Sequence, residues 1–311
     1  MLEVQDLVKV YENKNKNIRA IDGISFKIRE GGAVGILGPN GAGKTTTIKC
    51  ICDLIIPTSG MITLNGVDTL KHPSFVASSI SAVLEGNRNI YWRLTAEQNL
   101  EFFAGLMGRT VEKDRMDELI KNFDLAEKRK TQARFLSRGM QQKLAVACAL
   151  IKNTPVLLLD EPTLGLDVVS SHSLRKHIKE MVTKSKKTLL LSTHDMGVVK
   201  EVCDGVIIIN HGKIVTDDSV NNLLSLFRTR SYRFLIENNP GAIDAIKREF
   251  GVSAKPLNKK VEVLVNIYNS DQFYDFTERL KSYGCKIDSV EEINPDFEEI
   301  FMKLVEEKDE Q

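Results

Sequence analysis

The chain has 311 residues, of which 42% are hydrophobic and 27% charged, and its formal net charge is +1. These ordinary proportions exclude a disordered or a fibrous chain, and the length predicts about two domains. No apolar run approaches the roughly 18 residues that span a bilayer, and the first ten residues lack a signal-peptide pattern. We therefore expect a soluble chain that is not secreted.

The cysteines and the distribution of charge add two expectations. An odd count of five cysteines, three of them in apolar stretches, indicates buried free thiols in a reducing compartment. Residues 1–230 carry 32 Lys and Arg against 25 Asp and Glu, whereas residues 231–311 carry 11 against 17. This reversal predicts two regions of different design. The basic residues are scattered and form no patch with aromatic residues, so no nucleic-acid partner is expected.

The first 215 residues alternate short apolar runs with amphipathic segments. Leu2–Val10 and Ile18–Ile28 predict a small set of antiparallel strands. Four wholly apolar runs are too short for helices and predict strands that helices cover on both faces. They are Ala33–Leu37, Val156–Leu159, Leu189–Leu191 and Val206–Ile209. Together they predict an α/β fold with a mainly parallel sheet.

Three helices are predicted between these strands. A capping box, Thr95-Ala96-Glu97-Gln98, opens the first, which extends to about Met107. The other two are expected at Met140–Ile151 and Asp167–Lys184. They supply the covering layers that a parallel sheet requires.

The region after residue 215 has a different order of elements. A polar linker near Thr216–Asn222 and a helix to Phe227 predict a linker over residues 216–230. Residues 231–311 predict a small α+β domain whose βαββαβ order resembles a ferredoxin-like split βαβ. Its strands are expected at 231–237, 252–255, 260–266 and 285–290, and its helices at 240–250, 270–283 and from Pro295.

A glycine-rich loop follows the predicted strand Ala33–Leu37. Its sequence, Gly38-Pro39-Asn40-Gly41-Ala42-Gly43-Lys44-Thr45, matches the phosphate-binding pattern G-x-x-x-x-G-K-[ST]. The glycines let backbone amides turn toward an anion, and a helix starting near Lys44 adds the positive end of its dipole. Lys44 is expected to bind the β- and γ-phosphates and Thr45 to bind Mg²⁺. The pattern predicts a nucleoside triphosphate, and the absence of an NKxD motif argues against guanine specificity.

Two carboxylates, Asp160 and Glu161, directly follow the apolar run Val156–Leu159. At the end of a strand beside a phosphate loop, Asp160 can hold Mg²⁺ directly or through water. Glu161 can then lie near the γ-phosphate and activate a water for in-line attack. The alternative is that the pair merely ends a strand before Pro162.

Three further motifs complete a pattern that resembles the ATPase subunits of ATP-binding-cassette (ABC) transporters. Leu136-Ser137-Arg138-Gly139-Met140-Gln141 is similar to the family signature LSGGQ. Leu164-Gly165-Leu166-Asp167 is similar to its D-loop, and Ser192-Thr193-His194-Asp195 to its switch-histidine segment. The resemblance covers about residues 1–215. It implies a P-loop NTPase cassette with an antiparallel β subdomain and a helical subdomain at about residues 90–150.

The resemblance implies ATP and Mg²⁺ as cofactors and assigns a role to each motif. Lys44, Glu161 and His194 would be catalytic, and His194 would contact the γ-phosphate and orient the water and Glu161. Thr45 and Asp160 would hold the metal. The residues that would bind the nucleotide are Tyr11, which stacks on adenine, with Gly38, Pro39, Asn40, Gly41, Ala42, Gly43, Lys44, Thr45, Thr46, Glu85, Ser137 and Gly139.

The resemblance also implies partners. One chain carries one phosphate loop and one signature, so two cassettes would pair head to tail, more readily as a homodimer than as a heterodimer. A separate integral membrane permease would complete the transporter, with this chain in the cytoplasm on the inner face of the membrane. Trp92, the only tryptophan, lies with Tyr91 and Arg93 where the family's ATPase touches the membrane subunit. The alternative for Trp92 is a packed core aromatic.

Two positions depart from the family pattern. The family has Gln in its Q-loop, where this chain has Glu85, whose carboxylate could still approach Mg²⁺ or water. Met140 replaces the signature Gln but leaves Ser137 and Gly139 in place, so phosphate binding is expected to survive.

The leading hypothesis is the ATP-hydrolysing subunit of an exporter. The region after residue 215 resembles the accessory domain of bacterial drug- and antibiotic-exporting systems, and residues 295–301 resemble their closing phrase P-[DS]-[LF]-E-x-x-F. Two alternatives stay open. One is a soluble ABC ATPase of translation or DNA repair, which usually has two cassettes or a long coiled-coil insertion. The other is an ABC subunit that drives import.

Overall fold

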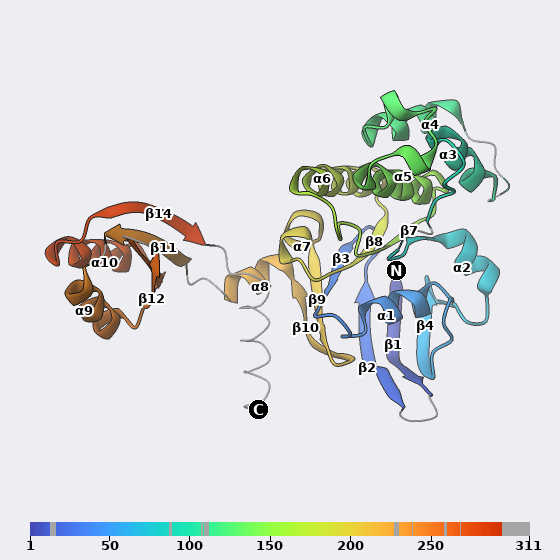
Figure 1. Cartoon of the computed structure of the whole chain (residues 1–311). Helices are drawn as coiled ribbons and strands as arrows, with labels where there is room; N and C mark the ends of the chain where they lie inside the picture. The colour runs from blue at the N-terminus through green and yellow to red at the C-terminus, as the bar shows by residue number, and fades with distance from the viewer. Residues whose placement is uncertain are drawn as a thin grey trace. The chain divides into compact units, whose positions relative to one another are not determined.

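The computed structural model describes residues 1–12, 17–86, 89–106, 108, 112–226, 230–237, 239–257, 260–267 and 269–293. These residues form two compact units that divide between Val220 and Asn221 (Figure 1). Within these ranges, no helix combines the length and the apolar composition needed to cross a bilayer.

The first unit is built on a six-stranded sheet in the order β10-β9-β3-β8-β7-β6. Five of these strands run parallel, and β10 pairs antiparallel with β9 at one edge. Every residue of β7 and β8 is buried, as expected for strands covered on both faces. The six strands are β3 (Ala33–Leu37), β6 (Ile80–Val83), β7 (Val156–Asp160), β8 (Thr188–Thr193), β9 (Gly205–Asn210) and β10 (Lys213–Ser219).

A second, antiparallel sheet has the order β2-β1-β4-β5. Helix α1 (Lys44–Ile51) contacts β2 of this sheet and β7 and β8 of the parallel sheet, and so lies between the two. Ile48 and Ile51 of this helix are fully buried in the core that both sheets share. The predicted antiparallel strands are confirmed. The strands of this sheet are β1 (Leu2–Tyr11), β2 (Ile18–Ile28), β4 (Ser59–Leu64) and β5 (Val67–Asp68).

Helices cover the other face of the parallel sheet, and a helical region lies beyond α5 and α6 in Figure 1. The capping box at Thr95 is confirmed, because its hydroxyl accepts from Gln98 N at 3.2 Å and its own N–H donates to Gln98 Oε1 at 3.0 Å. The other described helices of the first unit are α2 (Pro73–Ser79), α3 (Ala96–Gly105), α4 (Lys113–Asn122), α5 (Arg138–Ile151), α6 (Val168–Ser185) and α7 (Met196–Val202), with 3₁₀ turns η1 (Ala126–Lys128) and η2 (Ala133–Phe135). Helix α8 (Val220–Leu226) begins where the two units divide.

The segment Thr216–Asn222, predicted as a polar linker, is instead the end of β10 and the start of α8, whereas α8 agrees with the helical segment predicted next to it. Thr216 pairs with Ile208 and Asp217 with Ile207 of β9. An edge strand can carry such polar residues because one of its edges has no strand to pair with. The structure therefore divides the units five residues later than the predicted boundary at 215. The predicted end of the linker helix, Phe227, lies outside the described residues.

The second unit has the βαββαβ order that the sequence predicts. Its sheet has the order β12-β13-β11-β14 with antiparallel pairs throughout. Val261, Val263 and Val265 alternate with more exposed residues along β13, so one face of the sheet packs into a core. The ferredoxin-like assignment stays a prediction. The elements are β11 (Arg230–Glu237), α9 (Pro240–Phe250), β12 (Ser253–Leu257), β13 (Lys260–Ile267), α10 (Ser270–Ser282) and β14 (Ile287–Ile293). The predicted helix from Pro295 and the closing phrase lie outside the described residues.

The five cysteines are free thiols, as the odd count predicts. Four of them are buried, and Cys52 is half-buried. Burial raises the pKa of the Cys50 thiol to about 11 and that of Cys203 to about 12. These thiols are therefore protonated at neutral pH and act as small apolar core residues.

Candidate functional site

The phosphate loop joins β3 to α1, and two of its glycines lie close to the backbone of neighbouring strands. A Cβ on Gly38 would lie 2.3 Å from Ile209 O, and one on Gly43 would lie 2.5 Å from Ala20 O. Gly43 also has a φ of +111° and caps α1 without a side-chain hydrogen bond. The first amides of α1 thus carry no side-chain cap, and a helix N-terminus of this kind binds anions.

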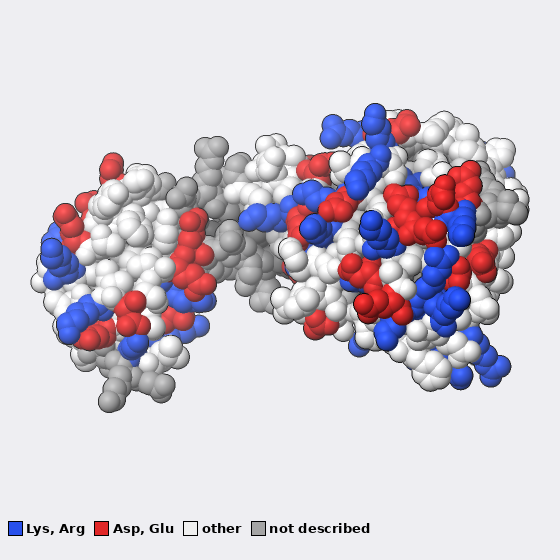
Figure 2. Space-filling model, turned by 90° about the horizontal axis from the view of Figure 1, so that it is seen from above, with Lys and Arg blue, Asp and Glu red and all other residues white. Residues whose placement is uncertain are grey.

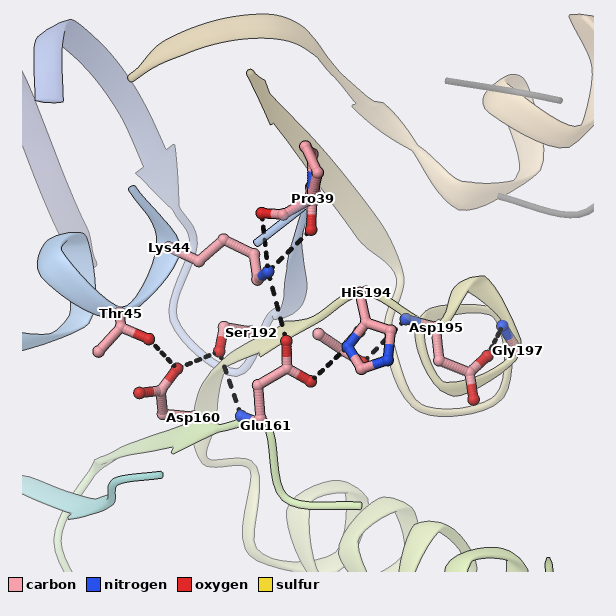
Figure 3. Close-up of polar contacts among 11 residues, drawn as sticks. Pro39, Lys44, Thr45, Asp160, Glu161, Ser192, His194, Asp195 and Gly197 are labelled. Atoms are coloured by element: carbon pink, nitrogen blue, oxygen red, sulfur yellow. Dashed lines mark hydrogen bonds and ion pairs between the residues drawn. The ribbon is translucent and has the colours of Figure 1, made fainter. Parts of the chain in front are cut away.

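Lys44 is held within the loop that it follows. Its ammonium donates to Gly38 O at 2.7 Å and to Pro39 O at 3.3 Å, and it lies 3.3 Å from Glu161 Oε1 (Figure 3). Both side chains of this ion pair are only 6% exposed. The pair balances the buried charges, and it places the cation beside the anion-binding amides.

Asp160 ends β7 and lies directly beside the phosphate loop. Its Oδ1 accepts from Thr45 Oγ1 at 3.1 Å and from the hydroxyl of Ser192 in β8. Its Oδ2 is buried and has no hydrogen-bond partner among the described residues. A buried carboxylate oxygen without a partner suits a cation at this point.

No described group of three or more His, Cys, Asp and Glu could hold a metal by itself. Mg²⁺ does not require such a group, because it is commonly bound by one or two carboxylates together with phosphate oxygens and water. Thr45 and Asp160 are placed to provide the protein's share of that coordination.

Glu161 adopts a strained backbone conformation, with a φ of +47°. Such a conformation costs about 1–3 kcal/mol outside glycine and persists where neighbouring contacts hold it. Here Glu161 N donates to Ser192 O at 3.0 Å and lies 3.2 Å from Ser192 Oγ. In the Glu161 side chain, Oε1 faces Lys44, and Oε2 lies 3.0 Å from His194 Nδ1. His194 follows β8, and Asp195 caps α7 by accepting from Gly197 N at 2.7 Å.

Ser192 contacts the carboxylate of Asp160 and the backbone amide of Glu161, and the sequence assigned it no role. It was visible only as the first residue of the segment that contains His194. The pairing of β7 with β8 places Ser192 opposite Asp160. Ser192 and Asp160 are 32 positions apart in the sequence, so their contact could have been predicted only from the order of the strands in the sheet.

A cavity of about 520 Å³ lies over the phosphate loop, a volume typical of small-molecule sites. It contains most of the predicted site residues, and Ile18, Ala20 and Leu164 line it as well, without having been predicted. The predicted residues that line it are Tyr11, Pro39, Asn40, Gly41, Ala42, Gly43, Lys44, Thr45, Thr46, Glu85, Glu161 and His194.

Ser137 and Gly139 do not line this cavity. Ser137 caps α5 by accepting from Met140 N at 3.2 Å, and this cap is why the helix begins two residues before the predicted start. Gly139 is buried, and a Cβ there would lie 2.7 Å from Ser170 Oγ of α6. Within one chain, Ser137 and Gly139 therefore lie outside the cavity over the phosphate loop.

The packed-core alternative for Trp92 is wrong. Trp92 is 50% exposed and Tyr91 is 51% exposed. The fully buried Asn99 holds the backbone of this segment, because its Oδ1 accepts from Tyr91 N at 2.7 Å and its Nδ2 donates to Tyr91 O at 3.1 Å. A rigid backbone thus presents two aromatic side chains to the surface.

Known proteins share this arrangement of fold and motifs. A family model described as ABC transporter matches residues 21–164. The ABC transporter ATP-binding protein NatA of Bacillus subtilis (strain 168) is 36% identical over 237 residues, which are 76% of this chain and 96% of NatA. The chain belongs to the ABC transporter ATP-binding family. Its predicted fold as an ABC cassette and its predicted ATPase activity are thereby confirmed.

A solved structure of this family resembles the cassette over nearly its whole length. It is the dimeric post-hydrolysis state of the ATP-binding cassette MJ0796 bound to ADP and Pi, with a TM-score of 0.65 and 26% identity. The match covers 71% of this chain and 99% of MJ0796. This ABC chain is therefore an ATP-binding, ATP-hydrolysing subunit.

The names of other relatives describe different kinds of transport. The methionine import ATP-binding protein MetN of Vibrio vulnificus (strain YJ016) is 35% identical, over 72% of this chain and 67% of MetN. The probable multidrug ABC transporter ATP-binding protein YbhF of Escherichia coli (strain K12) is 34% identical, over 72% of this chain and 38% of YbhF. Membership of the family does not by itself fix the direction in which an ABC subunit drives transport.

Proposed function

We propose that the chain is the ATP-hydrolysing subunit of an ABC exporter and that it works with a separate integral membrane permease. The buried Lys44–Glu161–His194 array beside the phosphate-loop cavity is the observation that carries the hydrolytic part. The second unit supports the exporter part, since its βαββαβ order resembles the accessory domain of drug-exporting systems. The likeness to YbhF is a second support.

Each residue of the array has a part in hydrolysis. Lys44 gives up its contact with Glu161 to bind the phosphates, which frees the carboxylate. Glu161 then accepts a proton from the attacking water, and His194 holds the Glu161 side chain from its other oxygen. Thr45 and Asp160 are the residues that would hold Mg²⁺, which neutralises phosphate charge when bound.

The signature requires a second cassette. Ser137 lies exposed at the N-terminus of α5, outside the cavity over its own phosphate loop. In a head-to-tail dimer, its hydroxyl and the nearby amides would meet the γ-phosphate held by the partner. The dimeric state of MJ0796 supports this arrangement. We propose a homodimer, because one chain carries both halves of the site.

The permease is proposed to dock on the exposed aromatic segment of the helical region. Tyr91 and Trp92 are half exposed there, and Phe135, which follows in η2, is 69% exposed. The backbone of the two segments is joined, since Arg134 N donates to Trp92 O at 3.1 Å. This surface would hold the cassette at the inner face of the membrane.

Affinity purification of the tagged full-length chain from detergent-solubilised membranes tests the proposal. Recovery of a polytopic membrane protein is expected, and Trp92→Ala should weaken that recovery while ATP binding remains. Recovery of ribosomes or DNA without a membrane protein would support the translation or repair alternative instead.

Inside-out vesicles that contain the complex test the direction of transport, and they should accumulate a drug probe such as ethidium on addition of ATP. Loss of preloaded probe on addition of ATP would favour import.

A further inference from the structure

A second cavity, of about 190 Å³, adjoins the nucleotide cavity. The two share Glu85, Glu161 and Leu164 as lining residues. Glu85 stands where the family has Gln, and Arg138, which also lines the second cavity, stands where the signature LSGGQ has its first Gly. Arg138 is thus a third departure from the family pattern, and it faces the same small space as Glu85, which is 53 positions away in the sequence.

The Arg138 guanidinium lies against the backbone of the D-loop. Gly165 has a φ of +72°, and a Cβ on it would lie 2.9 Å from Arg138 Cζ, 2.9 Å from Nη2 and 3.0 Å from Nη1. Three similar distances place one face of the planar guanidinium over Gly165. Any larger residue at position 165 would displace it, so the two residues fit each other.

A short turn connects this contact to the catalytic carboxylate. Leu164 N donates to Glu161 O at 3.2 Å, and Leu166 N donates to Thr163 O at 3.2 Å. Gly165 lies inside the second of these overlapping turns, four residues after Glu161. A displacement of Gly165 would therefore be transmitted to the strained backbone of Glu161.

The charges around the second cavity are unequal. Its described lining includes the three carboxylates Glu85, Asp160 and Glu161, and Arg138 is the one cation in that lining. Among the described residues, no ion pair joins Arg138 to any of the three, whereas Glu161 is already paired with Lys44. Asp160 is placed to meet a metal ion, so Glu85 is the remaining carboxylate without an assigned counter-charge, and both Glu85 and Arg138 are exposed at the rim of this cavity.

We propose that Arg138 is a positioning residue for ATP hydrolysis. Its guanidinium balances the charge of Glu85 across the second cavity and holds the D-loop at Gly165, which keeps Glu161 in place. The departures at Glu85 and Arg138 then compensate each other: a carboxylate in the Q-loop is matched by a cation in the signature. The proposal rests on the ATPase activity and is independent of the direction of transport.

A double-mutant cycle on the full-length chain tests this pairing. Glu85→Gln removes one charge with little change of shape, and Arg138→Gln removes the opposite charge together with the guanidinium that lies over Gly165. Each single variant should lower kcat about tenfold and change KM for ATP less than about twofold. The double variant should be no slower than the slower single variant, because the loss of either charge already ends the interaction. Arg138→Lys should give an intermediate kcat, since it keeps the charge and loses the planar face.

A matched control and an optical measurement complete the test. Arg134 lies four residues before Arg138, packs on the Phe135 ring at 4.7 Å and lines neither cavity. Arg134→Gln should leave kcat unchanged.

Trp92 is the only tryptophan and lines the second cavity, so acrylamide quenching of its fluorescence reports on that space. Quenching should increase by a similar factor in Glu85→Gln, Arg138→Gln and the double variant, with the thermal unfolding midpoint of each monitored in parallel.

Two outcomes would overturn the proposal. Multiplicative losses, about a hundredfold in the double variant, would show that the residues act independently. A raised KM for ATP and a loss of ATP-dependent dimerisation in Arg138→Gln, with Trp92 quenching unchanged, would place Arg138 on the partner's γ-phosphate instead.

Discussion

The two units of the molecule differ in where they keep their charges. In the described residues, every buried charged side chain belongs to the first unit. The second unit has ion pairs too, but they lie on its surface, as between Arg233 and Glu291 and between Lys260 and Asp288. The buried charged residues are Lys44, Lys143, Asp160, Glu161 and Lys187.

The first unit, which contains the catalytic site, buries charged side chains, whereas the second unit does not among its described residues. Burying an unpaired charge costs free energy of folding, so a buried charged side chain indicates a role other than stability, such as binding or catalysis. The second unit instead has a core of aliphatic and aromatic residues with Phe234 and Phe276 at its centre. On the face shown in Figure 2, acidic and basic side chains are interspersed on both units. The contrast therefore lies in the interior.

Replacement of Glu161 should have the largest effect. We expect Glu161→Gln to lower kcat by a factor of about 10² to 10⁴, because general-base catalysis contributes that much, while ATP still binds. Phosphate release and equilibrium nucleotide binding measure the two quantities. The matched control is Glu291→Gln, which removes a surface carboxylate of the second unit and should leave kcat unchanged. Near-normal turnover of Glu161→Gln would remove the general-base assignment.

Truncation of Phe276, in the core of the second unit, should have the second-largest effect. Phe276 is 1% exposed and packs edge-on against Phe234, with ring centroids 4.9 Å apart. Phe276→Ala should destabilise this unit by about 3–5 kcal/mol through lost burial and a cavity. Urea unfolding followed by circular dichroism should show an earlier transition for this unit, with ATPase activity retained. Leu280→Met, a nearly volume-conserving change in the same core, is the mild control. A parallel loss of ATPase activity would show that the second unit takes part in hydrolysis.

The sequence predicts the parts of the site that are local. The phosphate loop and the Asp160–Glu161 pair are each a few consecutive residues whose chemistry requires that order. Full burial of β7 and β8 follows from apolar runs that only a covered sheet accommodates. These features depend on neighbours in the chain, and the pattern alone is enough to find them.

The missed features depend on residues that are distant in the sequence. Ser192 meets Asp160 because two strands pair, and Arg138 meets Gly165 because α5 begins beside the D-loop. The strand β10 was missed for a related reason. Its polar residues read as a linker, and only its pairing with β9 makes the segment a strand.

Lys187 is a buried charge that lies outside the catalytic site. It is 5% exposed, and its ammonium donates to Asn153 Oδ1 at 3.1 Å and to Thr154 O. Burial lowers its pKa from 10.5 to about 8. Between about pH 8 and 10.5 the unfolded chain binds more protons than the folded one, so the free energy of unfolding rises with pH in that window.

The pH dependence can be assigned to this lysine by substitution. The free energy of unfolding of the parent protein minus that of Lys187→Met should increase by up to about 3 kcal/mol from pH 7 to 10.5. Urea titrations at four pH values measure the difference. Lys184→Met, at an exposed position in the last turn of α6, should give parallel curves. Parallel curves for Lys187→Met as well would mean that Lys187 is not titrating in this window.

The smallest effect is expected for the surface charges of the second unit. Arg233 is 43% exposed and lies 3.0 Å from Glu291 and 3.3 Å from Glu262, so it bridges three strands of the sheet. Arg233→Gln should lower the free energy of unfolding by less than about 1 kcal/mol, because water and salt screen exposed pairs. Urea titrations with and without 0.5 M NaCl (roughly a 4 Å screening length) should show the difference shrinking in salt. A loss above about 2 kcal/mol that salt does not reduce would show that this unit, too, depends on a charge network shielded from water.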